Sequence, residues 1–262
     1  MSVGILKRTA DWMAHWRAER RSIGIYATNE RTPFFREALK WLPEGKVTAI
    51  DVGGGLSNFA ELALAQNPSA SVWILDGNPD TVETLKESSK SALLYQARGR
   101  LPFADGAVAL IHCSHVIEHL PAPDLYFMLG EFKRVLAADG ILVISAPLLW
   151  GGFYNDLSHV RPYPPEILDK YLVGGDVGLS YSRRRIGGFK REALTYRYVK
   201  TLSGDNAGLR SEHAIADLVL CTSRRLLARC GFFHLEKTGF TVSYRRSDEP
   251  GMDFNEVQAG RA

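Results

Sequence analysis

The residues best suited to chemistry begin with Asp51-Val52-Gly53-Gly54-Gly55, where an apolar run ends in three consecutive glycines. Glycine reaches backbone angles closed to other residues, and it lets a ligand approach the backbone with no Cβ in the way. The helix expected behind this turn would offer free N–H groups to a polar ligand. The stretch therefore predicts a nucleotide-type binding turn between a buried strand and a helix.

Further polar residues stand where other apolar runs end. Asp76 closes residues 71–75, about twenty residues beyond the glycine turn, and a carboxylate there suits the two hydroxyls of a ribose. Ser114 and His115 follow residues 108–113. Because the carboxyl ends of parallel strands meet at one edge of a sheet, we expect these side chains to gather around one ligand.

A later loop, residues 155–165, contains Asp156 and His159. Histidine suits the removal of a proton from a hydroxyl because its pKa lies near neutrality. His159 is therefore a candidate general base, with Asp156 orienting it. The alternative is that both side chains hydrogen-bond the loop backbone and hold its shape.

A metal site is a further alternative for four residues of these loops: Glu118, His119, Asp156 and His159. No two of them have a recognised ligand spacing. We therefore expect no metal. Glu118 and His119 are expected to brace the loop, while His115 faces cofactor or substrate.

The elements that must position these residues follow from the apolar runs. Expected strands alternate with expected helices between residues 47 and 150. The strands are 47–52, 71–75, 92–97, 108–113 and 141–146, and the helices are 56–65, 79–91 and 121–136. This alternation predicts an α/β fold with a mostly parallel sheet, covered on both faces by helices.

These residues resemble the class I S-adenosylmethionine-dependent methyltransferases, in the branch that acts on small molecules and glycans. The resemblance covers residues 47–150 and rests on motifs in the right order: Asp51-x-Gly53-x-Gly55, Asp76, Leu101-Pro102-Phe103 and residues 114–120. A NAD dehydrogenase fits less well, because Asn58 stands where its third glycine would be.

The resemblance implies S-adenosyl-L-methionine as cofactor, bound by ten residues: Asp51, Gly53, Gly54, Gly55, Asp76, Gly77, Ala97, Arg98, Ser114 and His115. By it, the glycines approach the methionine part and Asp76 takes the ribose hydroxyls. Asp51 would orient the glycine loop or reach the ammonium group through water. Residues 97–98 would flank the adenine, and Ser114 and His115 would lie near the reacting methyl.

The sequence departs from the family pattern at two places. Ser57 replaces the third glycine, and residues 96–100 contain no acid for the adenine amine. The second departure supports an alternative reading, a methyltransferase-like binding or scaffold protein without catalysis. The three-glycine turn and Asp76 oppose that alternative.

The flanking segments carry weaker patterns. Residues 1–45 are expected to form helices that cover the sheet or, alternatively, a lid in which Trp16 and Tyr26 touch ligand. Residues 173–213 are glycine-rich, basic and aromatic. They predict a solvated insertion with a short strand at 193–201. The alternatives there are recognition of an anionic substrate, such as a phosphorylated sugar or an RNA, or a dimer contact.

The C-terminal part predicts a helix over residues 213–230 and two strands, 232–238 and 240–245, as an antiparallel hairpin at the sheet edge. The alternative is that 193–201 supplies one strand of that pair. The polar residues after 247 predict a disordered tail.

Composition sets only broad limits. The chain has 262 residues, a net charge of +3 and three cysteines, with no apolar run of membrane-spanning length. These features favour a soluble protein of a reducing, cytoplasmic compartment.

The fold class we expect is α/β, a Rossmann-like doubly wound sheet of seven strands, mostly parallel, with an antiparallel edge strand and N-terminal helices. The expected regions are a helical cover (1–45), a cofactor-binding core (46–150), a substrate-recognition loop and insertion (151–213), a C-terminal helix with edge strands (214–246) and a tail (247–262). The expected activity is methyl transfer to a hydroxyl, or a nitrogen, of a small molecule or glycan. This acceptor could carry an anionic group. The alternatives are an RNA or protein methyltransferase and the inactive binding protein.

Overall fold

The computed structural model describes residues 23–174, 185–201 and 234–247, together with five helical positions between 215 and 226. Its centre is one eight-stranded sheet in the order β1-β7-β8-β6-β5-β2-β3-β4. Strand β8 is antiparallel to β6 and β7, and all other neighbours are parallel. The expected α/β class with a mostly parallel sheet is confirmed.

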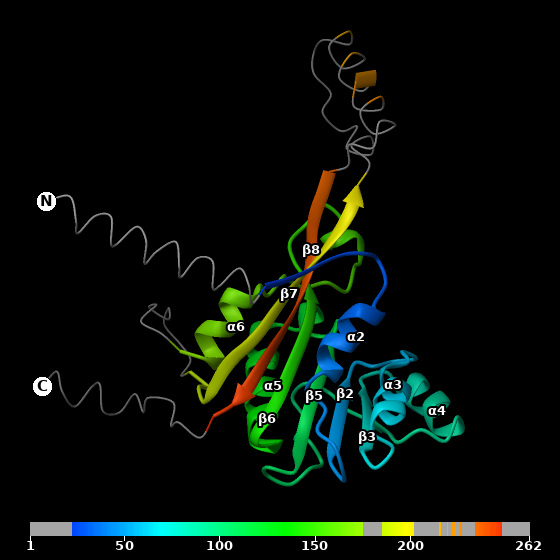
Figure 1. Cartoon of the computed structure of the whole chain (residues 1–262), viewed down its shortest axis with the longest axis vertical. Helices are drawn as coiled ribbons and strands as arrows, with labels where there is room; N and C mark the ends of the chain where they lie inside the picture. Colours follow the sequence, from blue (N-terminus) through cyan, green and yellow to red (C-terminus); the bar gives the residue numbers. More distant parts are fainter. Residues whose placement is uncertain are drawn as a thin grey trace, which may run out of the picture.

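The strands, in sheet order, are β1 (Ile23–Ala27), β7 (Phe189–Thr201), β8 (His234–Arg246), β6 (Leu136–Pro147), β5 (Val108–Ser114), β2 (Thr48–Val52), β3 (Ser71–Asp76) and β4 (Ala92–Leu94). The helices are α2 (Thr32–Leu39), α3 (Phe59–Gln66), α4 (Pro79–Glu87), α5 (Ala122–Val135) and α6 (Pro165–Leu172). Two 3₁₀ turns, η1 (Ile117–His119) and η2 (Phe153–Asn155), follow β5 and β6. Strands β7 and β8 are the longest and extend beyond their neighbours at one end (Figure 1).

The core lies on both faces of the sheet. On one face α5 and α6 pack against the strands through residues such as Phe132 and Leu168. On the other face α2, α3 and α4 pack through residues such as Phe35, Phe59 and Val82. The central strands are buried on both faces and therefore read as continuous apolar runs, which is why the sequence revealed them.

The expectation of helix throughout residues 1–45 is wrong for the part that the structure describes. Residues 23–27 form β1, which pairs in parallel with β7 in the register Ile23↔Leu194. Ile23, Ile25 and Tyr26 are residue types that favour strands, and the otherwise unpaired edge of β7 supplies the partner. The sheet therefore has eight strands rather than seven. The second expected helix exists as α2.

The expected C-terminal hairpin is also wrong. Residues 234–246 form one continuous strand, β8, in which Gly239 pairs with Arg197 of β7 and with Pro147 of β6. The alternative partner, residues 193–201, is the correct one because it lies in β7. The antiparallel strand is therefore internal to the sheet, since β7 and β1 lie outside it.

Several expectations fall outside the described residues. They concern Trp16, Arg183 and Arg184 of the basic insertion, and the C-terminal tail. Of the helix expected over 213–230 the structure describes only five positions, all helical and exposed: Ile215, Val219, Thr222, Ser223 and Leu226. None of the described helices is long and apolar enough to cross a membrane.

Candidate active site at the carboxyl edge of the sheet

The glycine turn after β2 has a backbone that only glycine fits. Gly53 and Gly55 have φ angles of +69° and +50°. A Cβ at Gly53 would lie 2.0 Å from Cγ2 of Val116, and a Cβ at Gly54 would lie 2.2 Å from Oδ2 of Asp51. At Gly53 the clash adds to the strain of a positive φ, so this position requires a residue without a Cβ.

Asp51 lies in β2 just before this turn, and its carboxylate packs against Gly54. It is almost completely buried, and its Oδ1 lies 2.7 Å from Nδ1 of His112 on the neighbouring strand β5. The His112 ring stacks on Phe59, with centroids 4.0 Å apart. The second oxygen of Asp51, Oδ2, is buried and has no hydrogen-bond partner among the described residues. No local sequence pattern marks His112 as part of the site, although its place across from Asp51 follows from pairing β5 with β2.

An open hollow of about 520 Å³ lies beside the turn, lined by the glycines, by residues 56–58 and by Arg31, Thr32 and Phe35. Asp76 ends β3 at the same edge, and a Cβ at Gly55 would be 3.8 Å from its Oδ2. Its Oδ1 accepts a hydrogen bond from the backbone N–H of Asn78 at 2.9 Å. That bond holds the carboxylate next to the turn and leaves Oδ2 on the side of Gly55.

The residues expected beside the adenine follow β4. Ala97 packs against the core, and the exposed Arg98 donates from Nε to Oδ1 of Asp124 at 2.6 Å. The Arg98 guanidinium is therefore occupied by the first turn of α5. Gly77, the other residue of this group, is exposed near the backbone oxygen of Tyr95.

A second, narrower cleft of about 10 Å³ lies against the end of β5, the last part of β6 and the middle of β8. Its lining comes from distant parts of the chain: Arg31, Phe34, Phe35, Ser114, His115, Ser145, Arg197, Phe240 and Thr241. Arg31 and Phe35 line both spaces. The structure thus brings Ser114 and His115 together with residues that the sequence did not single out.

His115 lies at the mouth of this cleft in a left-handed backbone conformation, with φ +56°. Its Nδ1 lies 3.0 Å from Oε1 of the buried Glu118. Burial lowers the pKa of His115, although the Glu118 carboxylate opposes the shift. A carboxylate only accepts, so Nδ1 carries the proton and Nε2 of the neutral ring keeps its lone pair.

The cleft also holds two arginines without a carboxylate partner within the described residues. Arg197 is half-buried, and its guanidinium lies over the Phe34 ring at 5.6 Å. Burial lowers the pKa of Arg197, and the charge of Arg31 lowers it further. Two like charges that face one space favour an anion between them.

Asp156 and His159 lie apart from both spaces. Asp156 accepts hydrogen bonds at Oδ1 from the backbone and hydroxyl of Ser158, at 2.9 and 2.6 Å. These bonds lower the pKa of the Asp156 carboxyl. His159 places Nδ1 2.6 Å from the Phe153 carbonyl and Nε2 3.9 Å from Asp156. The contacts are those of the loop-holding alternative, and the role of His159 as a base stays a prediction.

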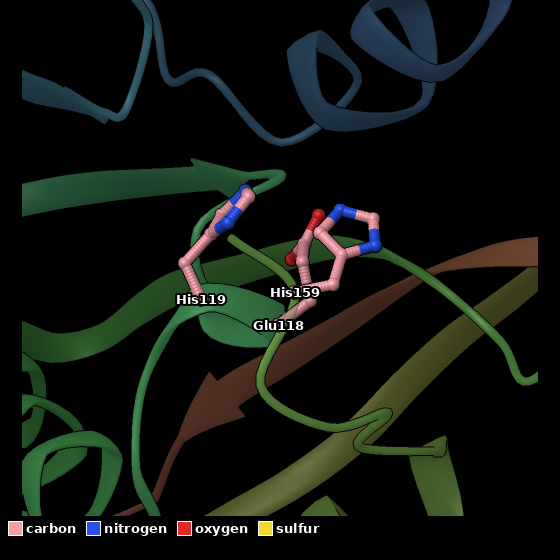
Figure 2. A group of neighbouring side chains, drawn as sticks. All are labelled: Glu118, His119 and His159. Atoms are coloured by element: carbon pink, nitrogen blue, oxygen red, sulfur yellow. The ribbon is translucent and has the colours of Figure 1, made fainter. Parts of the chain in front are cut away.

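His159 instead faces a different pair of residues. Figure 2 shows its ring beside Glu118 and His119, and the two histidine rings are 4.9 Å apart. Potential ligand atoms of the three residues all lie within 4.8 Å of one another. The backbone N–H of Val160 donates to the Glu118 carbonyl at 2.8 Å, which ties this loop to η1.

Comparison with known proteins assigns the core. Residues 50–144 match the family described as "Methyltransferase domain". The core of the chain thus matches a methyltransferase domain. An uncharacterized methyltransferase of Mycobacterium sp. (strain JLS) is 30% identical over 155 residues, which are 57% of this chain and 55% of that protein. The chain thus spans about half the length of this methyltransferase. A probable methyltransferase of Arabidopsis thaliana is 29% identical over 94 residues, 36% of this chain and 25% of that protein.

Solved structures agree on the fold. A SAM-dependent methyltransferase from Archaeoglobus fulgidus superposes with a TM-score of 0.54 at 17% identity, over 83% of this chain and 95% of that one. Geranyl diphosphate C-methyltransferase from Streptomyces coelicolor gives 0.51 at 12% identity, over 82% and 80%. The similarity of fold therefore extends well beyond residues 50–144.

Proposed function

We propose that the protein is an S-adenosylmethionine-dependent methyltransferase, with the methyl donor in the hollow beside the glycine turn and the acceptor in the adjoining cleft. The observation that carries this proposal is the shared wall of the two spaces, formed by Arg31 and Phe35. Methyl transfer needs the donor carbon and the acceptor atom to meet in line, and much of its rate comes from such positioning.

In this proposal the residues that bind the donor lie in or directly after the first two strands of the core, β2 and β3. Asp76 accepts hydrogen bonds from the ribose hydroxyls through the oxygen near Gly55. The second oxygen of Asp51, Oδ2, would receive the methionine ammonium through water. The turn itself supplies close approach, because Gly53 and Gly55 present no side chain.

The acceptor we propose is a hydroxyl, or a nitrogen, of a small molecule or glycan. His115 is the group to take its proton, because Nδ1 is held by Glu118 and Nε2 keeps its lone pair at neutral pH. His115 lines the cleft, whereas His159, the base expected from the sequence, is not among its lining residues.

An anionic acceptor is favoured by the two arginines. Arg31 and Arg197 line the cleft, and neither has a carboxylate partner within the described residues. Guanidinium groups bind carboxylates and phosphates through paired hydrogen bonds. The cleft is narrow, so entry of an acceptor requires these long side chains to move apart.

Calorimetry with S-adenosylmethionine and with its demethylated product tests the donor site. Asp76→Ala removes two charge-assisted hydrogen bonds, so affinity should fall by about 2–3 kcal/mol, roughly 30- to 150-fold. The control is Glu87→Ala at the exposed end of α4, which should bind as the wild type does. Absence of binding at millimolar ligand in the folded wild-type protein would sink the proposal and favour a scaffold role.

A further inference from the structure

We propose that Glu118, His119 and His159 bind a divalent transition-metal ion. The three side chains come from η1, after β5, and from the loop after η2, and they converge in Figure 2. Their potential ligand atoms lie within 4.8 Å of one another. The site is separate from the methyl-donor hollow and does not depend on the proposed methyl transfer.

Both histidines are held in the tautomer that a metal needs. Nδ1 of His159 lies 2.6 Å from the Phe153 carbonyl oxygen, which only accepts. Nδ1 of His119 lies 3.2 Å from the Ser158 carbonyl oxygen and 3.0 Å from the Ser158 hydroxyl, which donates its own hydrogen to Asp156. Each Nδ1 therefore carries the hydrogen, and each Nε2 keeps its lone pair. A ring N–H fixed by a carbonyl, with the other nitrogen on the ion, is the usual arrangement of metal-binding histidines.

Glu118 supplies an independent reason for an ion. The side chain is completely buried, and only Oε1 is engaged, by Nδ1 of His115 at 3.0 Å. Oε2 is buried, and no group in the described part of the chain forms a hydrogen bond with it. A buried carboxylate oxygen without a partner is costly, and a bound cation is one of the few groups that satisfy it.

The donor set selects the class of ion. Two imidazoles and one carboxylate suit Zn²⁺ and its first-row neighbours, whereas Mg²⁺ and Ca²⁺ prefer oxygen ligands only. Asp156 offers a further oxygen, since its Oδ2 lies 3.9 Å from Nε2 of His159. The sequence named these residues only as an alternative, because the roughly forty positions that separate His119 from His159 match no recognised ligand spacing.

The test uses the untagged full-length protein, stripped with a chelator and then titrated with Co²⁺ and Zn²⁺. We expect about one equivalent of Co²⁺ to give visible d–d absorption, which Zn²⁺ abolishes and millimolar Mg²⁺ does not. Metal content after dialysis against Zn²⁺ should also be about one equivalent per chain. A folded protein that shows neither result overturns the proposal.

Variants assign the ligands. His119→Gln, His159→Gln and Glu118→Gln should each weaken Zn²⁺ binding at least tenfold, while Glu61→Gln, an exposed carboxylate paired with Lys90, should not. Circular dichroism and melting curves check that each variant folds. If Glu118→Gln does not fold, the two histidine variants decide. Zn²⁺ binding unchanged in both of them overturns the assignment. S-adenosylmethionine binding, measured on the same samples, separates this result from the proposed function.

Discussion

The two halves of the carboxyl edge are built in different ways. On the donor side, the glycine turn, Asp51 and Asp76 belong to two consecutive strand–helix units, and the backbone itself sets their geometry. On the acceptor side, the cleft is assembled from α2, the end of β5, and strands β6, β7 and β8. Substitutions on the donor side should therefore disturb folding and binding together. Substitutions in the cleft should leave the fold intact.

The largest effect is expected at Gly53. Gly53→Ala imposes a side chain on a residue with φ +69° and places its Cβ 2.0 Å from Cγ2 of Val116. We expect a loss of stability of about 3–4 kcal/mol and loss of S-adenosylmethionine binding. Denaturant unfolding and calorimetry measure the two quantities.

Gly130→Ala is the matched control, because a Cβ at Gly130 in helix α5 meets nothing within 4 Å. Alanine favours helix over glycine by up to about 1 kcal/mol, so this variant should be as stable as the wild type or more so. Equal stability of Gly53→Ala and Gly130→Ala would show that the turn does not depend on glycine.

Asp51 should have the next largest effect. Asp51→Ala leaves the buried His112 ring without its partner at 2.7 Å, which should cost about 2–3 kcal/mol of stability. Asp105→Ala is the control, since Asp105 is largely exposed in its ion pair with Arg134 and should change stability little. A stable Asp51→Ala protein that still binds S-adenosylmethionine would remove Asp51 from the donor site.

This contrast explains how much the sequence revealed. The strands of the core and the donor turn were predictable from local sequence patterns. A buried parallel strand gives an apolar run, and a turn with positive φ angles gives glycines. The pairing of Asp51 with His112 needed only the strand order in addition. Local pattern was enough wherever a function rests on one strand and its following turn.

The cleft left no such marks. Arg197 lies in the middle of β7 and Arg31 precedes α2, and only the sheet order β1-β7-β8-β6 brings them to one space. The error over residues 23–27 has the same cause, since β1 is a strand only because the edge of β7 is available to it. Likewise the spacing of His119 and His159 gives no sign that their rings approach.

A smaller effect is expected from the protonation of His115. Burial lowers its pKa in the folded protein, so the unfolded chain binds more protons near its ordinary pKa of about 6.5. The free energy of unfolding is therefore unaffected by His115 above about pH 6.5 and decreases as the pH falls below that value. The slope cannot exceed about 1.4 kcal/mol per pH unit.

The measurement is the free energy of unfolding of the wild type and of His115→Gln at pH 7.5 and pH 5.5. The wild type should lose more stability than the variant on acidification. An equal loss in the two proteins would mean that burial does not lower the pKa of His115 in the folded protein.

The smallest effect, and the sharpest contrast within one strand, is expected at Arg197 and Arg191 of β7. Arg197 is half-buried and faces Arg31, whereas Arg191 donates to Oδ2 of Asp169 at 2.6 Å. Arg197→Met replaces a desolvated charge by an apolar side chain that can still pack on Phe34. It should raise stability by about 0.5–1 kcal/mol. Arg191→Met breaks a partly exposed ion pair and should lower the stability by up to about 1 kcal/mol.

Denaturant unfolding of both variants measures these two changes in the free energy of unfolding, which should have opposite signs. If Arg197 destabilises the fold, its presence in the cleft is not explained by stability. Binding of an anionic acceptor would explain it. If Arg197→Met instead destabilises as Arg191→Met does, the guanidinium serves the fold, and the case for an anionic acceptor loses its main support.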